Sequence, residues 1–299
     1  MKKYLIIMLA LLLTLLPYTS AEPQQVDVGL YILNLGKFDV GTGAFTADFY
    51  LSMKCEEECS PDKFEFMNGR AASIDKAIDK PNEKFYRIQA NLNSPVDLKK
   101  FPFDSQKMQI IIEDKEQTTE DLIYNPDMEE SGIDPAVTFP GWNLDGWTAE
   151  ASEHDYPVYG EKYSQYVFSI DISRIKLNSF IKTFLPIIFI ILVALCSFLL
   201  DPDKVSTRMG MVGSALAASV MFHVSISNQI PPVGYLTFAD KFMGLTYFIL
   251  LLSFTLNVVM MELQARKKDH LVNKMHAMTE YSIFVVVPLL YLLLFIFGI

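Results

Sequence analysis

Hydrophobic positions along the chain follow two different patterns, one in each half. In the N-terminal half, short apolar runs with partial alternation are separated by turn residues such as Gly41-Thr42-Gly43 and Pro140-Gly141. Such runs between turn signals are typical of β-strands. The pattern predicts strands at residues 26–35, 45–53, 85–92, 108–113 and 166–172, with a weaker candidate at 147–154. Many short strands at this spacing indicate an all-β sandwich.

The C-terminal half carries four long apolar stretches instead. They lie at about residues 178–200, 206–227, 238–261 and 281–299. Each provides the roughly 20 residues that a helix needs to cross a bilayer. We therefore expect a β-sandwich domain over residues 22–177 and a transmembrane domain over residues 178–299.

The first 21 residues differ from both halves. Lys2 and Lys3 precede an apolar run at residues 5–16, and Thr19-Ser20-Ala21 offers small residues for cleavage. This arrangement indicates a secretory signal peptide over residues 1–21. An uncleaved anchor helix is the alternative, although the apolar run is short for a membrane span.

Charge also separates the two halves. Residues 22–177 contain 29 acidic and 15 basic residues, a net charge of −14. Basic residues in the second half gather around the connectors between spans: Lys204, Arg208, Arg266, Lys267, Lys268 and Lys274. Because short basic connectors stay in the cytoplasm, we expect a multi-pass protein of the cell (inner) membrane. Its acidic domain and its C-terminus would lie in the periplasm or outside the cell.

Two of the three cysteines lie close together in the acidic half. Cys55 and Cys59 enclose three glutamates, and an oxidising compartment would let them form a disulfide. A metal site is the alternative, but no histidine lies nearby in sequence and two thiols alone make a poor zinc site. Cys196 falls in the first predicted span and is interpreted as a small packing residue.

The sequence shows no catalytic pattern. The four histidines are scattered along the chain, two of them in the predicted basic connector, and Gly41-Thr42-Gly43 suits a hairpin turn better than a phosphate site. We therefore expect neither an enzyme nor a nucleic-acid partner, and no cofactor or structural metal.

One segment resembles a known protein family. Residues 94–108 read SPVDLKKFPFDSQKM, with an apolar Phe-Pro-Phe in a loop where polar residues are usual. The pentameric ligand-gated ion channels, or Cys-loop receptors, have a signature loop of the form Cys-Pro-x-Asp-x₃-Phe-Pro-x-Asp-x-Gln-x-Cys. The chain matches it in register at Pro95, Asp97, Phe101, Pro102, Asp104 and Gln106. Ser94 and Met108 replace the two cysteines, as in bacterial members of the family.

The resemblance extends over residues 26–299. Gly141-Trp142 before a strand, Ile172-Ser173-Arg174 before the first span, Pro186 within it, and the connector Ile230-Pro231-Pro232-Val233-Gly234-Tyr235 all resemble family segments. One region departs, because Cys55 replaces a family tryptophan and only a short loop follows it. The resemblance implies an immunoglobulin-like sandwich, a four-helix transmembrane bundle and a homopentameric ring. Its partners would be four identical subunits and membrane lipid.

In this family the signature loop contacts the membrane domain. The resemblance therefore implies that Phe101 and Phe103 are buried against the ends of the spans, near Pro231 and Tyr235. Pro102 would fix the backbone, with a cis bond as one option. The carboxylate of Asp104 is expected to pair with Arg174, and Asp39 to be a third partner. An ordinary ion pair with no part in gating is the alternative.

The second span carries a stripe of mostly small or polar residues: Ser206, Gly210, Ser214, Ala217, Met221, Val224 and Asn228. Spacings of three and four place them on one face of a helix. Five such helices would enclose a water-filled tube that narrows at Met221 and Val224 and closes by dewetting. The same small residues also suit close helix packing. His223 would either titrate and tune gating or be a hydrogen-bonded buried histidine.

Several groups are candidates for the trigger. Phe66, Tyr156, Tyr159 and Tyr163 fall in regions that bind ligands in relatives, and tyrosine faces can hold an ammonium group; cross-strand packing is the alternative. Protons or a regulatory Ca²⁺ on clustered carboxylates are further candidates. These carboxylates are Glu56, Glu57, Glu58, Glu129, Glu130 and Asp134. A solvated acidic surface with no regulatory role is the alternative.

The expected function is a ligand-gated ion channel, opened by a small amine, a proton or a divalent cation. We expect cation conduction because the acidic domain would concentrate cations. The inner mouth, Val205-Ser206-Thr207-Arg208, has neither the acidic ring nor the Pro-Ala-Arg sequence of relatives. A non-conducting, membrane-anchored sensor with the same fold is the alternative.

Overall fold

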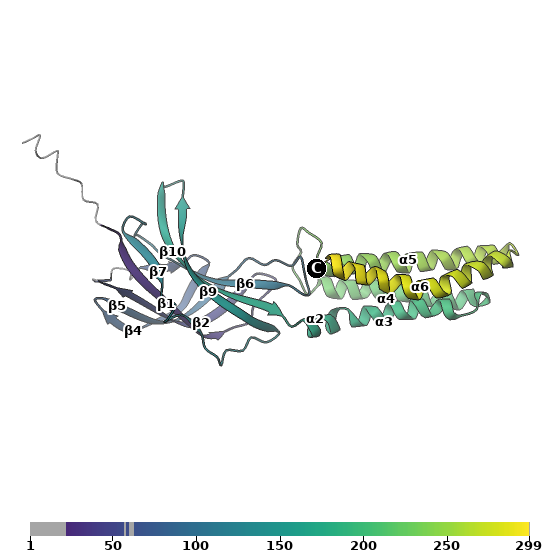
Figure 1. The fold of residues 1–299 in the computed structure, drawn as a ribbon, viewed down its shortest axis with the longest axis horizontal. Coiled ribbons are helices and arrows are strands. Elements are labelled where there is room, and N and C mark those ends of the chain that lie inside the picture. Colours follow the sequence, from purple (N-terminus) through teal and green to yellow (C-terminus); the bar gives the residue numbers. More distant parts are fainter. Residues whose placement is uncertain (1–21, 57, 60–62, 299) are drawn as a thin grey trace, which may run out of the picture.

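A strand-rich part and a helical part lie end to end along the long axis of the molecule (Figure 1). This computed structural model describes residues 22–56, 58–59 and 63–298. The signal-peptide prediction for residues 1–21 lies outside the described residues.

The strands form two sheets. One sheet has the order β4-β5-β2-β1-β7, with β8 beside β1, and the other has the order β3-β6-β10-β9. The bounds are β1 Gln24–Leu35, β2 Ala44–Cys55, β3 Phe64–Phe66, β4 Gly69–Lys80, β5 Glu83–Asn93, β6 Ser105–Asp114, β7 Leu122–Pro126, β8 Gly132–Ile133, β9 Trp142–Tyr156 and β10 Glu161–Arg174. All six predicted strands are present, with bounds that extend beyond the predicted ones.

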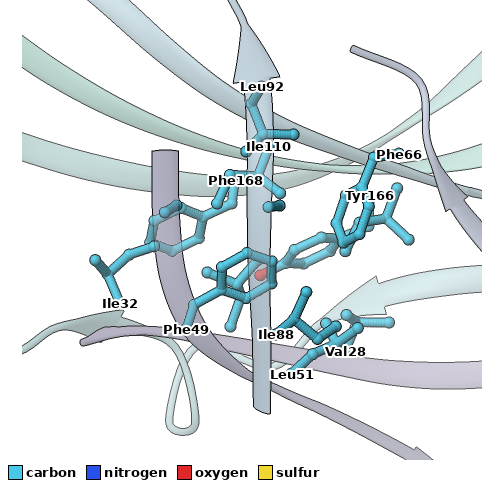
Figure 2. Packing of buried hydrophobic residues seen from close by; sticks show 14 of the residues in the cluster. Val28, Ile32, Phe49, Leu51, Phe66, Ile88, Leu92, Ile110, Tyr166 and Phe168 are labelled. Carbon is cyan, nitrogen blue, oxygen red and sulfur yellow. The ribbon is translucent and has the colours of Figure 1, made fainter. Parts of the chain in front are cut away.

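A single hydrophobic core lies between the two sheets (Figure 2). Val28, Leu51 and Ile88 enter it from one sheet and are fully buried. Ile110 and Phe168 enter it from the other. Successive side chains on a strand point to opposite faces, so the alternation in the sequence becomes one buried face and one exposed face. The two sheets therefore form a sandwich.

Strand β4 was not predicted from the sequence. Its residues read GRAASIDKAIDK, and most of them are exposed. It is an edge strand that pairs only with β5. Only Ala71 near its start packs against the core, so its sequence lacks the alternation by which the other strands were found.

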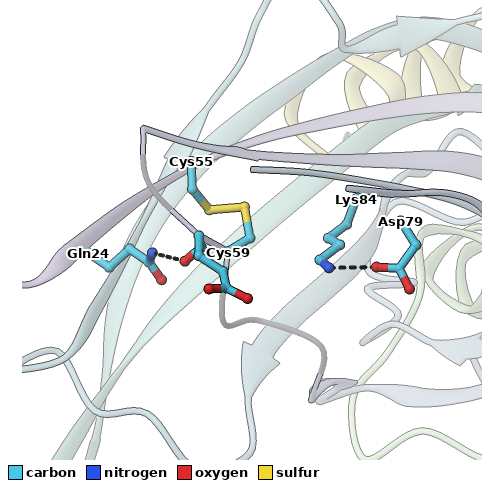
Figure 3. The surroundings of a disulfide bond; sticks show 6 residues. Gln24, Cys55, Cys59, Asp79 and Lys84 are labelled. Carbon is cyan, nitrogen blue, oxygen red and sulfur yellow. Dashed lines mark hydrogen bonds and ion pairs between the residues drawn. A yellow bond between two sulfur atoms is a disulfide. The ribbon is translucent and has the colours of Figure 1, made fainter. Parts of the chain in front are cut away.

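The disulfide predicted between Cys55 and Cys59 is present, with the two Cα atoms 5.4 Å apart (Figure 3). It closes the turn that follows β2. The side-chain amide of Gln24 donates a 2.7 Å hydrogen bond to the carbonyl oxygen of Glu58, which ties this turn to the first residue of β1.

The helices are α2 Lys176–Thr183, α3 Leu185–Cys196, α4 Val205–Ser227, α5 Phe238–Ala265 and α6 Asp269–Gly298, with short 3₁₀ turns η1 Ser197–Leu199 and η2 Pro202–Lys204. By length and composition, α4 with η2, α5 and α6 could each cross a membrane. Helices α2 and α3 with η1, bent by 43° at Phe184, together make a fourth candidate span. The break has a clear cause, because Pro186 lies in the first turn of α3 and cannot continue a preceding helix.

Helix α6 begins at Asp269, well before the predicted start of the fourth span at residue 281. The connector between α5 and α6 is therefore shorter than the sequence predicted, and His270, Lys274 and His276 lie within a helix. The apolar pattern marks only the part of this helix that suits lipid. The polar first turns carry residues such as Lys, Met and Glu, which favour helix without being apolar.

Candidate functional site

The loop between β5 and β6 joins the sandwich to the helices. Leu98 and Phe101 are buried, at 0% and 2% exposed, in a cluster with residues of α3 and α5. The Phe101–Pro102 peptide bond is cis. The apolar tip of the loop is thus covered by the ends of the helices, as the resemblance implied.

Backbone hydrogen bonds fasten this loop to the start of α5. The amide of Phe238 donates to the carbonyl of Lys99 (2.9 Å), and the amide of Ala239 donates to the carbonyl of Phe101 (3.0 Å). First-turn amides of a helix have no partner within the helix, so the loop caps α5. The hydroxyl of Tyr235 accepts a 2.9 Å hydrogen bond from the amide of Leu98. The two backbone bonds to α5 could not be predicted from the sequence.

The ring of Phe103 contacts three helical segments. It stacks on Phe184, at the bend between α2 and α3, with 5.7 Å between ring centroids. It also lies 5.9 Å from Phe238 in α5 and 6.2 Å from Phe295 near the end of α6. Pro231 is half-buried in the connector between α4 and α5. Among the described residues it makes no hydrogen bond to the loop.

The carboxylate of Asp104 pairs with Arg174 at the C-terminal end of β10, with Arg174 Nε 2.6 Å from Asp104 Oδ1. Asp104 is 1% exposed, and its second oxygen accepts a 2.7 Å bond from Gln106. The guanidinium of Arg174 also lies over two rings, 4.5 Å from Trp142 and 5.1 Å from Phe101. A buried charge is costly unless it is paired and hydrogen-bonded, and both conditions hold here.

Asp39 does not join this pair, so its expected place as third partner is wrong. Its carboxylate accepts a 2.8 Å bond from the amide of Gly41 and a 3.0 Å bond from the hydroxyl of Thr42. These two bonds lower the pKa of Asp39. Aspartate in a tight turn commonly accepts a hydrogen bond from the backbone two residues further on, and Asp39 makes this bond instead of pairing with Arg174.

Helix α4 presents all seven residues of the predicted stripe on its exposed side. The side chains of Met221 and Val224 are 76% and 56% exposed. The opposite side of α4 is buried against its own subunit through Arg208, Val212, Ala215, Ser219 and Ile226. α4 packs against α3 and α5. The stripe therefore faces away from the helices of the same chain.

Arg208 lies in the first turns of α4 and is 1% exposed, not in a connector as its charge suggested. Its guanidinium carbon lies 5.1 Å from the ring centroid of Phe198. Nη1 lies 4.0 Å from the sulfur of Met260, and Nε and Nη2 have no partner among the described residues. This buried cation thus has no carboxylate beside it in the described part of the chain.

His223 faces α5 and not the exposed stripe. Its Nδ1 lies 2.9 Å from the hydroxyl of Tyr247, and its Nε2 lies 3.3 Å from Asp240 Oδ1. Both ring nitrogens have partners within the subunit. The hydrogen-bonded histidine was one of the two alternatives left open by the sequence.

Three of the four predicted ligand-binding residues lie together. Tyr156, Tyr159 and Tyr163 line a cavity of about 270 Å³ with Glu65, Glu113, Asp114, Lys115 and Glu161. Phe66 does not reach it. That ring is 7% exposed and packs edge-on against Phe49 and Phe64 in the sandwich core. In β3 the two phenylalanines point inward, so Glu65 between them faces the cavity.

Behind this cavity, Glu113 gathers three side chains from two other strands. Tyr156 donates to its Oε1 (3.0 Å), Gln165 donates to its Oε2 (2.7 Å), and Nδ1 of His154 lies 3.1 Å from Oε2. Burial and the bond to Glu113 raise the pKa of Tyr156 to about 12. Sequence reasoning missed Glu113, His154 and Gln165, because strand pairing alone brings them together.

The described acidic residues form no group of three or more that could hold a metal ion. Glu130 instead pairs with Lys54, and this contact lowers the pKa of Glu130. Glu57 lies outside the described residues. A regulatory Ca²⁺ stays a prediction.

Two curated proteins are similar to this chain. A "proton-gated ion channel" of Gloeobacter violaceus is 21% identical over 257 residues, which is 77% of this chain and 71% of the relative. A "pH-sensitive chloride channel 2" of Drosophila melanogaster is 28% identical over 173 residues, which is 54% of this chain but only 33% of that relative. No protein-family model matches the chain.

The similarity to the Gloeobacter channel spans most of both chains, and the structure has the same order of parts that the signature loop implied. A strand-rich domain precedes a set of apolar helices, and a Phe-Pro-Phe-Asp loop joins the two. The chain is therefore homologous to these two ion channels and has the arrangement that its resemblance to the pentameric ligand-gated ion channels implied.

Proposed function

We propose that five copies of this chain form a proton-activated, cation-conducting channel in the cell (inner) membrane, with the sandwich outside. The observation that carries the proposal is the orientation of α4. All seven residues of its stripe are exposed in the single subunit, whereas the other side of the helix is buried. Like interfaces between copies would close a ring, with these stripes turned toward a central pore.

The residues along the stripe suit a gated pore. Ser206, Gly210 and Ser214 are small or polar, and Asn228 is polar at the other end. Met221 and Val224 between them would form two apolar rings. A narrow apolar ring excludes water, and therefore ions, until it widens. We place the gate at these two rings, because Ala217 is too small to close the pore.

The buried loop supplies a mechanical link for gating. Its carbonyl groups cap α5, and Phe103 contacts residues of α5 and α6. The Asp104–Arg174 pair fixes the same loop to the strand that leads into α2. A shift of β6 or β10 would therefore move the ends of several helices together.

Protons are the trigger that we favour over small amines or divalent cations. The names of both relatives refer to protons or pH. In addition, the tyrosine-lined cavity of this chain is rich in carboxylates, which protons can neutralise. Three tyrosines and several carboxylates could also hold a primary amine, so the bilayer recordings include application of an amine.

Two features act on ion selectivity in opposite directions. The sandwich domain, at −14, would concentrate cations at the outer mouth. Arg208 is buried behind the stripe, near the inner end of α4, and has no carboxylate partner among the described residues. Its positive charge would favour anions at that end. Because the net charge of the sandwich domain is much larger than the single charge of Arg208, we propose cations.

Purified protein in a planar bilayer, bathed in asymmetric salt, tests the proposal. We expect no current at neutral pH, stepwise current on acidification of the sandwich side, and a reversal potential near the cation equilibrium value. A reversal potential near the chloride value would overturn cation selectivity alone. Current evoked by a primary amine at neutral pH, with none evoked by acid, would show that the trigger is an amine and not a proton. Silence of a verified pentamer under all of these conditions would favour a non-conducting sensor.

A further inference from the structure

The buried carboxylate of Glu113 lies at the end of the sandwich that is far from the helices. Its side chain is only 4% exposed. It accepts hydrogen bonds from Tyr156 and Gln165, and His154 lies within hydrogen-bonding distance. Among the described residues, no lysine or arginine pairs with it. An ionised carboxylate at such a site depends on neutral donors, and a nearby positive charge would stabilise it further.

His154 can provide that charge. Its side chain is 38% exposed, so it can exchange protons with water. A neutral imidazole beside an ionised carboxylate must place its one N–H on the nitrogen that faces the carboxylate, here Nδ1. A second proton on Nε2 adds a full positive charge while the Nδ1–H bond to Glu113 is kept. Histidine is the side chain that undergoes this change between about pH 5 and 8.

The charged groups around the pair come from four strands. Lys115 and Asp114 follow Glu113 on the chain, Glu65 faces the cavity from β3, and Glu161 faces it from β10. The carboxylate of Asp114 accepts bonds from the amides of Glu116 and Gln117 (2.9 and 2.8 Å). On β9, Glu153 pairs with Lys162. The carboxylates that line the cavity outnumber its one lysine, which favours uptake of a proton.

Two of the three strands that hold this cluster, β6 and β10, also lead to the pair that contacts the helices. β6 and β10 are antiparallel and paired without a register shift from Glu113 opposite Gln165 to Ser105 opposite Ser173. Asp104 and Arg174 are the next residues beyond that end. At about 3.4 Å per residue, roughly 27 Å of unbroken ladder connects the cluster to the ion pair. The sheet thus provides a continuous path between the two.

We propose that His154 and Glu113 form the proton-binding site that activates the channel. The proton places a positive charge on the donor of a hydrogen bond whose acceptor is already ionised, and a bond between two opposite charges is stronger and shorter. Because β10 lies between β9 and β6, the side chains of β9 that reach across β10 to Glu113 thereby pull the β9–β10 hairpin toward β6. The movement passes along β6 and β10 to Asp104 and Arg174. This inference rests on the proposed function, because it names the group through which protons act.

Recordings from the full-length protein test the site. His154→Gln keeps a side chain that can donate to Glu113 but cannot take up the proton, and Glu113→Gln removes the negative charge. In each variant we expect half-activation to need at least about tenfold more protons, within the range usual for coupling between sites. Glu153→Gln is the matched control, since it removes a neighbouring carboxylate that is 63% exposed, and half-activation should stay within a factor of two.

A second measurement does not depend on current. A nitroxide label attached at Val158→Cys, in a Cys196→Ser background, reports the β9–β10 hairpin, because Val158 is 90% exposed at its tip. We expect the label to become less mobile on acidification in the parent and to show no pH response with His154→Gln. A parent with no current but a pH-dependent label would overturn the channel and leave the proton site in place.

Normal acid activation of both His154→Gln and Glu113→Gln, with an unchanged label response, would overturn the site and leave the channel. His223→Gln tests a second candidate for the proton sensor, because both ring nitrogens of His223 lie within hydrogen-bonding distance of polar groups of α5. A shift in half-activation with His223→Gln but not with His154→Gln would move the proton sensor into the helical part and refute the inference.

Discussion

Replacement of Arg174 takes away the partner of a buried carboxylate, so its effect on the free energy of unfolding follows directly from the structure. Arg174→Gln leaves the carboxylate of Asp104, which is 1% exposed, with only the Gln106 side chain as a donor at 2.7 Å. Breaking a buried ion pair on one side costs about 3–5 kcal/mol, because an uncompensated charge stays behind. For a chain of this size that corresponds to a fall in melting temperature of roughly 10 °C.

Substitution of the other partner, Asp104, should lower the free energy of unfolding by a smaller amount. Asp104→Asn leaves Arg174 with a side chain that is 20% exposed and still lies over the rings of Trp142 and Phe101. Water and the two rings then compensate part of the lost contact, and we expect a cost of about 1–3 kcal/mol. The double variant should lose less than the sum of the two, and the difference measures the coupling of the pair.

Tryptophan fluorescence during thermal unfolding of the detergent-solubilised protein provides the assay. The chain has two tryptophans, so Trp147→Phe leaves Trp142, 4.5 Å from the guanidinium, as the only reporter. Lys107→Gln is the control, because it removes an exposed pair of the same two strands, Lys107–Asp171 at 3.9 Å, and should change stability by less than about 0.5 kcal/mol. Melting of Arg174→Gln within 2 °C of the parent, or strict additivity in the double variant, would refute the reasoning.

Three further predictions address the gate, the core and the acidic surface. Met221→Ser or Val224→Ser should produce leak current at neutral pH in bilayer recordings, since a polar ring no longer excludes water; an unchanged resting current would move the gate elsewhere. Phe66→Ala should lower the free energy of unfolding by about 3–5 kcal/mol without changing the proton dependence, because the ring packs in the core. Glu130 has its pKa lowered by Lys54, so its contribution to stability is present above its ordinary pKa and is lost as pH falls through the lowered one. Lys54→Gln should therefore lower the melting temperature at neutral pH and make its further fall on acidification smaller, because this contribution is then lost at every pH.

The sequence identified those parts of the site that are encoded locally. The loop of residues 94–108 is contiguous, and the α4 stripe follows from helical spacing alone, so both could be located without a structure. Strands with one buried face were found for the same reason. β4 was missed because an exposed edge strand needs no apolar face, and the start of α6 was missed because hydropathy does not mark polar helical turns.

The remaining parts depend on tertiary pairing or on local competition. Glu113 and Gln165 are 52 residues apart in sequence and meet only through the register of β6 with β10. The inward direction of Phe66 depends on which face of the three-residue strand β3 meets the core, and a strand this short has no pattern to fix its face. Asp39 had two possible partners, and its own turn lies nearer than Arg174.

The exposed faces of two helices favour the proposed ring of several copies of the chain. α6 exposes Val285, Leu289, Leu292, Ile296 and Phe297, all of which are apolar and suited to lipid. The exposed stripe of α4 includes Ser206, Ser214 and Asn228. Polar side chains directed into hydrocarbon are costly, so this face needs water or protein beside it. A subunit alone in a bilayer supplies neither, whereas a ring with α4 innermost and α6 outermost gives each face the surroundings that its side chains require.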